Sequence, residues 1–210
     1  MTDNFVLLNE FEQDAIAEIA NLGIGRAANA LRKLVGEQVF LSVPSVQVVT
    51  RKAASQLVET SLMTKLVAVQ QKFAGSFSGA ALLIFPEPQS LELIRAIVGA
   101  EKSLQEILEL EDDALAETGN IILNSYLGTI GSVLNEQFEI SLPSVIRARG
   151  KTLFDSNDSQ SENPVLLLYI NFKLRTRAIS GFVALLMDVP GLESFRMIVR
   201  QFVENQQKQS

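Results

Sequence analysis

An internal duplication constrains the fold of this chain more than any other feature of its sequence. The octapeptide DAIAEIAN at residues 14–21 returns 99 positions later as DALAETGN at residues 113–120. The landmark Val-Pro-Ser-Val at residues 43–46 returns at the same offset as Leu-Pro-Ser-Val at residues 142–145. Two landmarks that keep their order and their spacing indicate two copies of one structural unit.

A third landmark agrees with the first two. Phe-Ser-Gly at residues 77–79 precedes an apolar run and returns as Ile-Ser-Gly at residues 179–181. A chain of 210 residues has the length of one large domain or of two small ones. We therefore expect one domain, residues 1–210, made of two internal repeats at about 8–105 and 106–208.

Each repeat is predicted to hold the same series of elements. Periodicity and composition predict a long helix at 12–36 and 111–136, paired strands at 65–75 with 78–85 and at 164–176 with 178–188, and a closing helix at 88–99 and 191–206. An extended stretch is expected after each Pro-Ser-Val landmark, and the polar segment 155–164 is expected to form a hairpin tip. Strand pairs followed by helices are typical of α+β proteins. We expect an α+β fold of two pseudo-two-fold-related repeats whose sheets merge.

The composition excludes several kinds of chemistry. The chain has no cysteine and no histidine, so it cannot supply a cysteine nucleophile, a Ser-His-Asp triad, a phosphohistidine or a Cys/His zinc site. Its formal net charge is −6 and its basic residues are scattered. A nucleic-acid partner is not expected, because binding to phosphates requires a basic surface.

The sequence also indicates a cytoplasmic protein. The first residues, MTDNFVLLNEFEQD, lack the basic start and the long apolar stretch of a signal peptide. No apolar run reaches the roughly 18 residues that a membrane-spanning helix requires, so we expect no membrane insertion.

The two long helices are predicted to carry a polar line on the face away from the core. Apolar and small residues recur at helical spacing from Ile16 to Leu34 and from Leu115 to Val133, which predicts a core-facing stripe on each helix. The residues of the opposite line are Glu18, Asn21, Gly25 and Asn29 in the first helix and Glu117, Asn120, Asn124 and Gly128 in the second.

Two features of this polar line are unusual. A glycine inside a helix costs ~1 kcal/mol relative to alanine, so Gly25 and Gly128 favour a surface that another backbone approaches closely. Asparagine is a mediocre helix former, yet Glu-x-x-Asn is present in both copies, although the residues between change from Ile-Ala to Thr-Gly. Simple solvation of an outer face would explain these polar residues in either helix alone. The retention of the Glu-x-x-Asn pair in both helices favours a functional surface.

Asp-x-x-x-Glu-x-x-Asn at the start of a helix, present twice in a chain of this length, resembles the CheC/CheX/FliY phosphatase family. The resemblance covers essentially the whole chain. It implies that Glu18 with Asn21 and Glu117 with Asn120 are the catalytic residues. It also implies that the helix docks on a phosphorylated CheY-like response regulator, that the glutamate binds a lysine of that partner, and that the asparagine orients water on the aspartyl phosphate. No cofactor or metal is expected on this chain, since the regulator supplies Mg²⁺.

These residue types suit such a reaction. An aspartyl phosphate is a reactive mixed anhydride, so a helper protein mainly has to position the attacking water. A side-chain amide both donates and accepts hydrogen bonds, and it lacks the charge with which a carboxylate would repel the phosphoryl group. The resemblance, with which this chemistry is compatible, implies a hydrolase that acts on protein phosphoaspartate in chemotaxis. Because an internal duplication can replace a dimer, we expect a monomer.

Other interpretations are compatible with the sequence. The chain could be a non-catalytic binding module, either a flagellar-switch relative or an adaptor for CheD, which the resemblance also implies as a partner. The apolar stripe from Leu192 to Phe202 could serve as such a surface, although stripes of this kind more often face the core. The glycines at residues 23–28 superficially match a dinucleotide-binding fingerprint, but they lie inside a helical pattern rather than between a strand and a helix.

Overall fold

The computed structural model of the chain describes residues 8–36, 38–62, 65–98, 103–154, 162–174 and 177–209. Its strands are β1 (Val39–Thr50), β2 (Leu66–Ala74), β3 (Gly79–Pro86), β4 (Glu139–Ile140), β5 (Ser144–Ala148), β6 (Pro164–Leu174) and β7 (Arg177–Leu186). Its helices are α1 (Glu10–Val35), α2 (Arg51–Leu62), α3 (Glu87–Val98), α4 (Leu104–Leu134), α5 (Gly150–Phe154) and α6 (Val189–Gln209). The predicted α+β class is confirmed.

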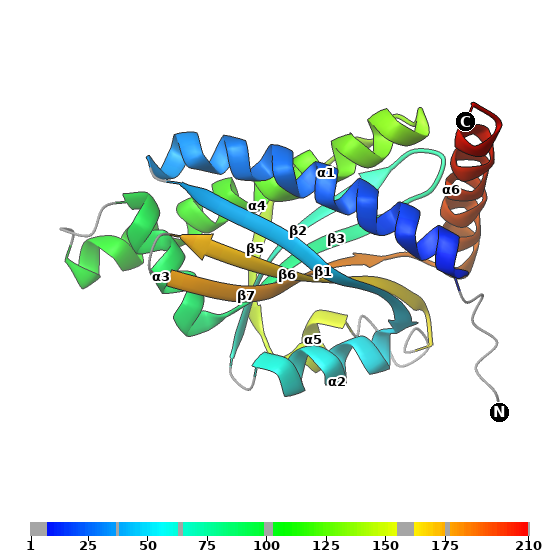
Figure 1. Cartoon of the computed structure of the whole chain (residues 1–210). Helices are drawn as coiled ribbons and strands as arrows, with labels where there is room; N and C mark the ends of the chain where they lie inside the picture. Colours follow the sequence, from blue (N-terminus) through cyan, green and yellow to red (C-terminus); the bar gives the residue numbers. More distant parts are fainter. Residues whose placement is uncertain are drawn as a thin grey trace.

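Helices cover both faces of a single antiparallel sheet (Figure 1). The long helices α1 and α4 pack side by side against one face, while α2 and α5 pack together on the other. Alternate residues of β2 serve the two sides, since Val67 and Val69 belong to the core beneath α1 and α4, and Leu66 and Ala68 belong to the core beneath α2 and α5. The sheet therefore has a separate hydrophobic core on each side, and the helices α1 and α4, which carry the polar line, pack on one of the two cores.

The centre of the sheet relates the two halves of the chain. The strand order is β1-β6-β7-β3-β2-β4, and β5 also pairs with β2. The valines of the two Pro-Ser-Val landmarks hold matching places, because Val46 pairs with Leu168 of β6 and Val145 pairs with Val69 of β2. The same arrangement on either side of the β3–β7 pair confirms two pseudo-two-fold-related repeats with a merged sheet.

Capping boxes start both long helices. The side chain of Asn9 accepts a hydrogen bond from the Glu12 backbone while the Glu12 carboxylate accepts one from the Asn9 backbone, and Ser103 with Glu106 does the same for α4. Such reciprocal bonds satisfy amide groups that a helix start leaves without partners. Because Ser103 provides this start, α4 begins at Leu104 rather than at the predicted residue 111, and the predicted repeat boundary falls within its first turn.

Most of the other predicted elements are confirmed within a few residues, but α2 and α5 were missed. Each follows a strand of the Pro-Ser-Val stretch within one residue, and the apolar residues of both helices become part of a core only by packing on the far face of the sheet. Leu34 was predicted to face the core and is 37% exposed in the last turn of α1. The predicted hairpin tip at 155–164 falls largely on residues 155–161, which lie outside the described residues.

The closing helix α6 turns its apolar stripe inward, since Leu192, Phe195 and Val199 are buried. The core interpretation of this stripe is therefore confirmed. Across the described ranges, no helix combines the length and the apolar character needed to cross a bilayer.

Candidate functional site

The predicted site residues lie on α1 and α4, at the sides of the helices where their asparagines reach strands β1 and β2. Glu18 and Asn21 are exposed on α1, and Glu117 is exposed and Asn120 half-buried on α4. We refer to Glu18 with Asn21 as the α1 site and to Glu117 with Asn120 as the α4 site. In the described part of the chain, no hydrogen bond or ion pair joins one site to the other, so each is a surface of its own helix.

Each site is followed by a glycine that the chain itself does not require. Apart from the neighbouring residues and the backbone of its own helix, a Cβ atom added at Gly25 or at Gly128 would find no atom of this chain within 4 Å. Both glycines have helical backbone conformations, which alanine would adopt at lower cost. The fold itself therefore gives no reason for a glycine at either position. Close approach of another molecule to the helix would explain both glycines.

At the α1 site the asparagine is anchored by backbone. Asn21 Oδ1 accepts a hydrogen bond of 3.3 Å from the amide of Val43 in β1. The pairing of β1 with β6 shifts register between Ser42 and Ser45, which leaves Val43 out of the ladder and its amide available. The residue of β6 opposite this bulge is Ile170, whose side chain is buried and cannot form a hydrogen bond with Asn21.

At the α4 site the asparagine is anchored by side chains. Asn120 Oδ1 accepts hydrogen bonds from Gln71 Nε2 at 3.1 Å and from Asn124 Nδ2 at 2.7 Å. Gln71 is 1% exposed, and its Nε2 also donates to the Ser141 carbonyl at 2.9 Å. The structure therefore places Asn120 in a polar network that has no counterpart at Asn21.

A close contact between α4 and β2 makes this network possible. A Cβ atom on Gly119 would lie 2.4 Å from Val69 Cγ1, so any larger residue would push the helix away from the strand. Gln71 follows Val69 by two residues on the same face of β2, and Asn120 follows Gly119 on α4. At the corresponding place on α1, the residue is Ala20.

An exposed leucine is adjacent in sequence to a residue of the α1 site and to a residue of the network at the α4 site. Leu22, next to Asn21, is 52% exposed, and Leu142, next to the Ser141 carbonyl, is 89% exposed. Exposed leucines beside polar residues are typical of surfaces that bind another protein.

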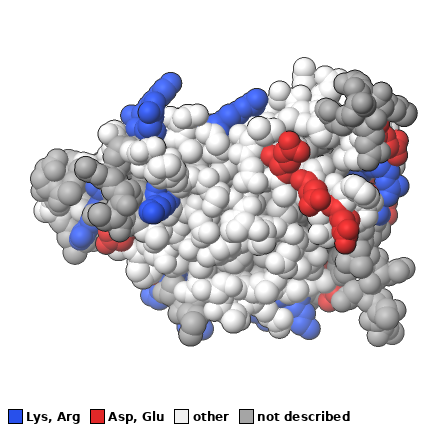
Figure 2. All heavy atoms as spheres, in the orientation of Figure 1, with Lys and Arg blue, Asp and Glu red and all other residues white. Residues whose placement is uncertain are grey.

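The surface around the two pairs is acidic. Figure 2 shows acidic side chains in a row along the N-terminal half of α1. Exposed carboxylates recur every four residues on both helices: Glu10, Asp14 and Glu18 on α1, and Glu109, Asp113 and Glu117 on α4. Like charges at this spacing weaken a helix slightly, so the row favours a role outside the fold, such as attraction of a basic partner.

A buried carboxylate fastens α1 to the closing helix. Glu12 is 2% exposed, and its carboxylate forms ion pairs with Arg196 Nε at 2.9 Å and with Arg200 Nη2 at 3.0 Å. Burial opposes its charged form, but hydrogen bonds from the Asn9 backbone and from the two arginines outweigh burial and lower the pKa of Glu12. At the equivalent position of α4, Glu111 pairs with Arg147 at 3.1 Å.

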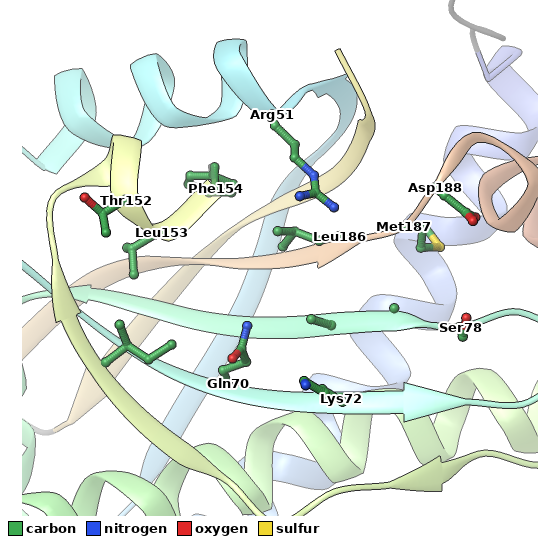
Figure 3. A pocket seen from close by; sticks show the side chains of 13 residues that line it. Arg51, Gln70, Lys72, Ser78, Thr152, Leu153, Phe154, Leu186, Met187 and Asp188 are labelled. Carbon is green, nitrogen blue, oxygen red and sulfur yellow. The ribbon is translucent and has the colours of Figure 1, made fainter. Parts of the chain in front are cut away.

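A pocket in the described part of the chain lies away from both sites. Its volume is about 440 Å³, and it lies on the face of the sheet that carries α2 and α5. Figure 3 shows Arg51, Lys72 and Asp188 among its lining residues. None of the predicted site residues lines it. The described residues also contain no group of three or more carboxylates placed to hold a metal ion.

Sequence reasoning missed Gln71 and Leu142. Gln71 carries a weak signal, because Val67, Val69 and Phe73 predict that residue 71 of the strand faces the core, where an amide is unusual. The exposure of Leu142 carries none, since its counterpart Val43 is 6% exposed at the same place in the repeat.

Comparison with known proteins gives related sequences over most of the chain. The family described as chemotaxis phosphatase CheX matches residues 67–165, which include the α4 site and Gln71 but not the α1 site. The flagellar motor switch phosphatase FliY of Bacillus subtilis is 30% identical over 143 residues, which make up 66% of this chain and 36% of that protein. The CheY-P phosphatase CheC of the same organism is 24% identical over 143 residues, 66% of this chain and 67% of CheC.

Solved structures share the fold. Thermotoga maritima FliY superposes with a TM-score of 0.75 at 18% identity, covering 94% of this chain and all of that chain. The FliM middle domain from H. pylori superposes with a TM-score of 0.63 at 12% identity, covering 91% of this chain and 99% of that chain. At these identities the likeness concerns the fold alone.

Proposed function

Because this chain belongs to the CheC/CheX/FliY family of chemotaxis phosphatases, we propose that it hydrolyses the aspartyl phosphate of a CheY-like response regulator. The observation that carries the proposal is the Glu-x-x-Asn pair on α1 and again on α4, with the glutamate exposed in both, and each pair is followed by a glycine with open space around it. The chain spans 36% of the length of its FliY relative, so the proposal concerns the activity of this part.

The asparagine would position the attacking water. The amide oxygens of Asn21 and Asn120 are both held by donors of the chain itself, so each amide can turn its Nδ2 group toward a docked partner. That group can donate a hydrogen bond to a water molecule and leave a lone pair of the water free to attack. The water oxygen then bonds to phosphorus as the bond to the aspartyl oxygen breaks, which yields inorganic phosphate and a free carboxylate.

The glutamate would hold the partner in place. Glu18 and Glu117 each lie three residues before an asparagine on the same helix face. An ion pair with a lysine of the regulator, formed at the edge of a water-excluding contact, would fix the helix over the phosphorylated aspartate. The exposed Leu22 and Leu142 would supply apolar contacts beside these pairs.

No proton-abstracting residue on this chain is needed. Aspartyl phosphate has a good leaving group, and neutral water in the right position is sufficient to hydrolyse it. We propose that Mg²⁺ comes with the regulator and stabilises the charge that develops on the phosphoryl oxygens. We further propose that one chain carries both sites and works as a monomer in the cytoplasm, and that a CheD-like protein is a second partner.

The test is the decay of radiolabelled phosphate on a phosphorylated CheY-like regulator with Mg²⁺, with the chain present at substoichiometric amounts. We expect wild-type protein to accelerate decay with multiple turnovers. The Asn21→Ala/Asn120→Ala variant should bind the regulator and leave its decay at the rate in buffer. Acceleration by the double variant that equals wild type would contradict the proposal.

A binding module without activity is the second candidate, and the shared fold of the FliM middle domain is the observation that favours it. This candidate predicts that the regulator or another chemotaxis protein binds wild type and double variant alike, with no acceleration by either. The same decay experiment, with binding measured in parallel, separates the two functions.

A further inference from the structure

The polar network beneath the α4 site contains a buried amide that no step of the proposed reaction has used. Gln71 is 1% exposed and lies on β2 among apolar neighbours that form the core under α1 and α4. Its Nε2 points at the Oδ1 atoms of Asn120 and Asn124, at 3.1 and 3.4 Å, and at the Ser141 carbonyl, at 2.9 Å. Its Oε1 is buried without a hydrogen-bond partner among the described residues.

A buried acceptor without a partner, such as Gln71 Oε1, lowers the stability of the fold, so a reason is needed for its presence.

The sheet register allows a direct comparison of Gln71 with its counterpart in the other repeat. Val46 and Val145 are equivalent, and their partners Leu168 and Val69 are followed two residues later by Ile170 and Gln71. Since Ile170 is fully buried at the equivalent position, the fold accepts an aliphatic side chain there and does not itself require an amide.

We infer that Gln71, together with Asn124, is a positioning residue that fixes the Asn120 amide for catalysis. The inference rests on the proposed phosphatase function. A carbonyl oxygen has two lone pairs, and Gln71 Nε2 and Asn124 Nδ2 use both of those on Asn120 Oδ1. The amide is thereby held with its oxygen inward and its Nδ2 group outward, and none of the hydrogen bonds among the described residues uses that Nδ2.

The neighbouring elements explain why this arrangement exists at one site only. Between β4 and β5 the chain leaves the ladder at residues 141–143, so the Ser141 carbonyl turns toward Gln71. Asn124 has Gly25 as its counterpart on α1, so the α1 site lacks both donors. Asn21 instead depends on one longer bond from the Val43 backbone. The α4 site is therefore preorganised by side chains and the α1 site is not.

The experiment replaces Gln71 with leucine in protein whose α1 site has been silenced by Asn21→Ala, so that only the α4 site reports. We expect kcat for phosphate release from the regulator to fall about 10- to 100-fold, with KM nearly unchanged because Glu117 and the docking surface are intact. We expect the melting temperature to stay the same or to rise, because the buried unpaired Oε1 is removed. A purely structural role for Gln71 predicts the opposite, a lower melting temperature.

Matched variants complete the test. Gln70→Leu changes the same residue type on the same strand but on the opposite face, and it should leave kcat unchanged. Asn124→Ala, at a half-buried position on α4, should lower kcat in the same direction as Gln71→Leu. In protein with Asn120→Ala, Gln71→Leu should have no effect on the α1 site.

Two outcomes would overturn the inference while leaving the phosphatase proposal intact. One is full kcat in the Gln71→Leu and Asn124→Ala proteins. The other is an equal loss at both sites together with a lower melting temperature. Absence of any acceleration by wild type in the same assay would instead remove the proposed function itself.

Discussion

The α1 site and the α4 site carry the same two residues in different surroundings. Asn21 is exposed and anchored by one backbone amide, whereas Asn120 is half-buried and anchored by the amides of Gln71 and Asn124. The difference originates in the strand below, where β1 makes a bulge and the second copy breaks into β4 and β5. The duplicated motif thus has the same position on both helices, and the strands beneath each helix determine how many hydrogen bonds fix its asparagine.

The largest expected effect comes from exchanging the asparagine amide for a carboxylate of the same shape. With the other site silenced by alanine, Asn120→Asp or Asn21→Asp should lower kcat by about 100-fold. The change removes the outward N–H donors and places a negative charge against the phosphoryl group. Phosphate release at saturating regulator measures this effect. Half or more of the activity remaining would show that the amide donors are not required.

The second effect concerns the buried carboxylates that fasten each long helix. Glu12→Gln should lower the free energy of unfolding at pH 7 by about 2 kcal/mol, because Arg196 and Arg200 lose their shared partner. Glu111→Gln should cost less, since Arg147 keeps Asp112 at 2.6 Å. Urea unfolding of both variants makes this comparison, and equal losses would contradict it.

The pH dependence of the Glu12 effect has a definite sign. Its pKa in the folded protein is lowered from the ordinary value of 4.5. The stabilisation is therefore complete above about that pH and is lost as the pH falls through the folded-state pKa. Wild type and Glu12→Gln should converge in stability at acid pH, and a difference that grows on acidification would contradict the ion-pair account.

The third effect tests the close approach of α4 to β2. Gly119→Ala should lower the free energy of unfolding by about 1–2 kcal/mol, because the new Cβ would meet Val69 Cγ1 at 2.4 Å. It should also lower kcat at the α4 site, since Asn120 moves away from Gln71. The α1 site, which already has Ala20, should keep its activity. Unchanged stability and kcat would show that the contact relaxes without consequence.

The smallest effect comes from the exposed glycines and differs in sign between stability and function. Gly25→Ala and Gly128→Ala should each raise the free energy of unfolding by up to about 1 kcal/mol, because nothing in the chain contacts the added Cβ. Each should raise KM at its own site, since the regulator then meets an extra methyl group. An unchanged KM at both sites would remove the explanation of close approach.

Much of the fold could be predicted from the sequence because it depends on local patterns. The repeat, the four central strands and both long helices follow from periodicity and landmarks at fixed spacing. The helices α2 and α5 could not be predicted in this way, since their apolar residues become a core only against the far face of the sheet. The start of α4 was readable from Ser103 and Glu106, a capping box that the prediction did not use.

The site was predictable in its helix residues and not in what holds them. Spacing places Glu117 and Asn120 on one face of a helix, whatever lies beneath. The contact between Asn120 and Gln71 depends on the register of β2 against α4, on Gly119, and on a break in the neighbouring strand. Gln71 contacts Asn120 across 49 residues and Ser141 across 70 residues, and no local pattern encodes such contacts.

The most direct test of two working sites in one chain is a comparison of four proteins in one assay. The decay of phosphorylated regulator is measured with wild type, with Asn21→Ala, with Asn120→Ala and with the double variant, each at the same concentration. We predict that the double variant matches buffer, that both single variants retain activity, that Asn21→Ala retains the larger share, and that the two single-variant rates add up to the wild-type rate. Complete loss in either single variant, or acceleration by the double variant, would contradict two independent asparagine-dependent sites.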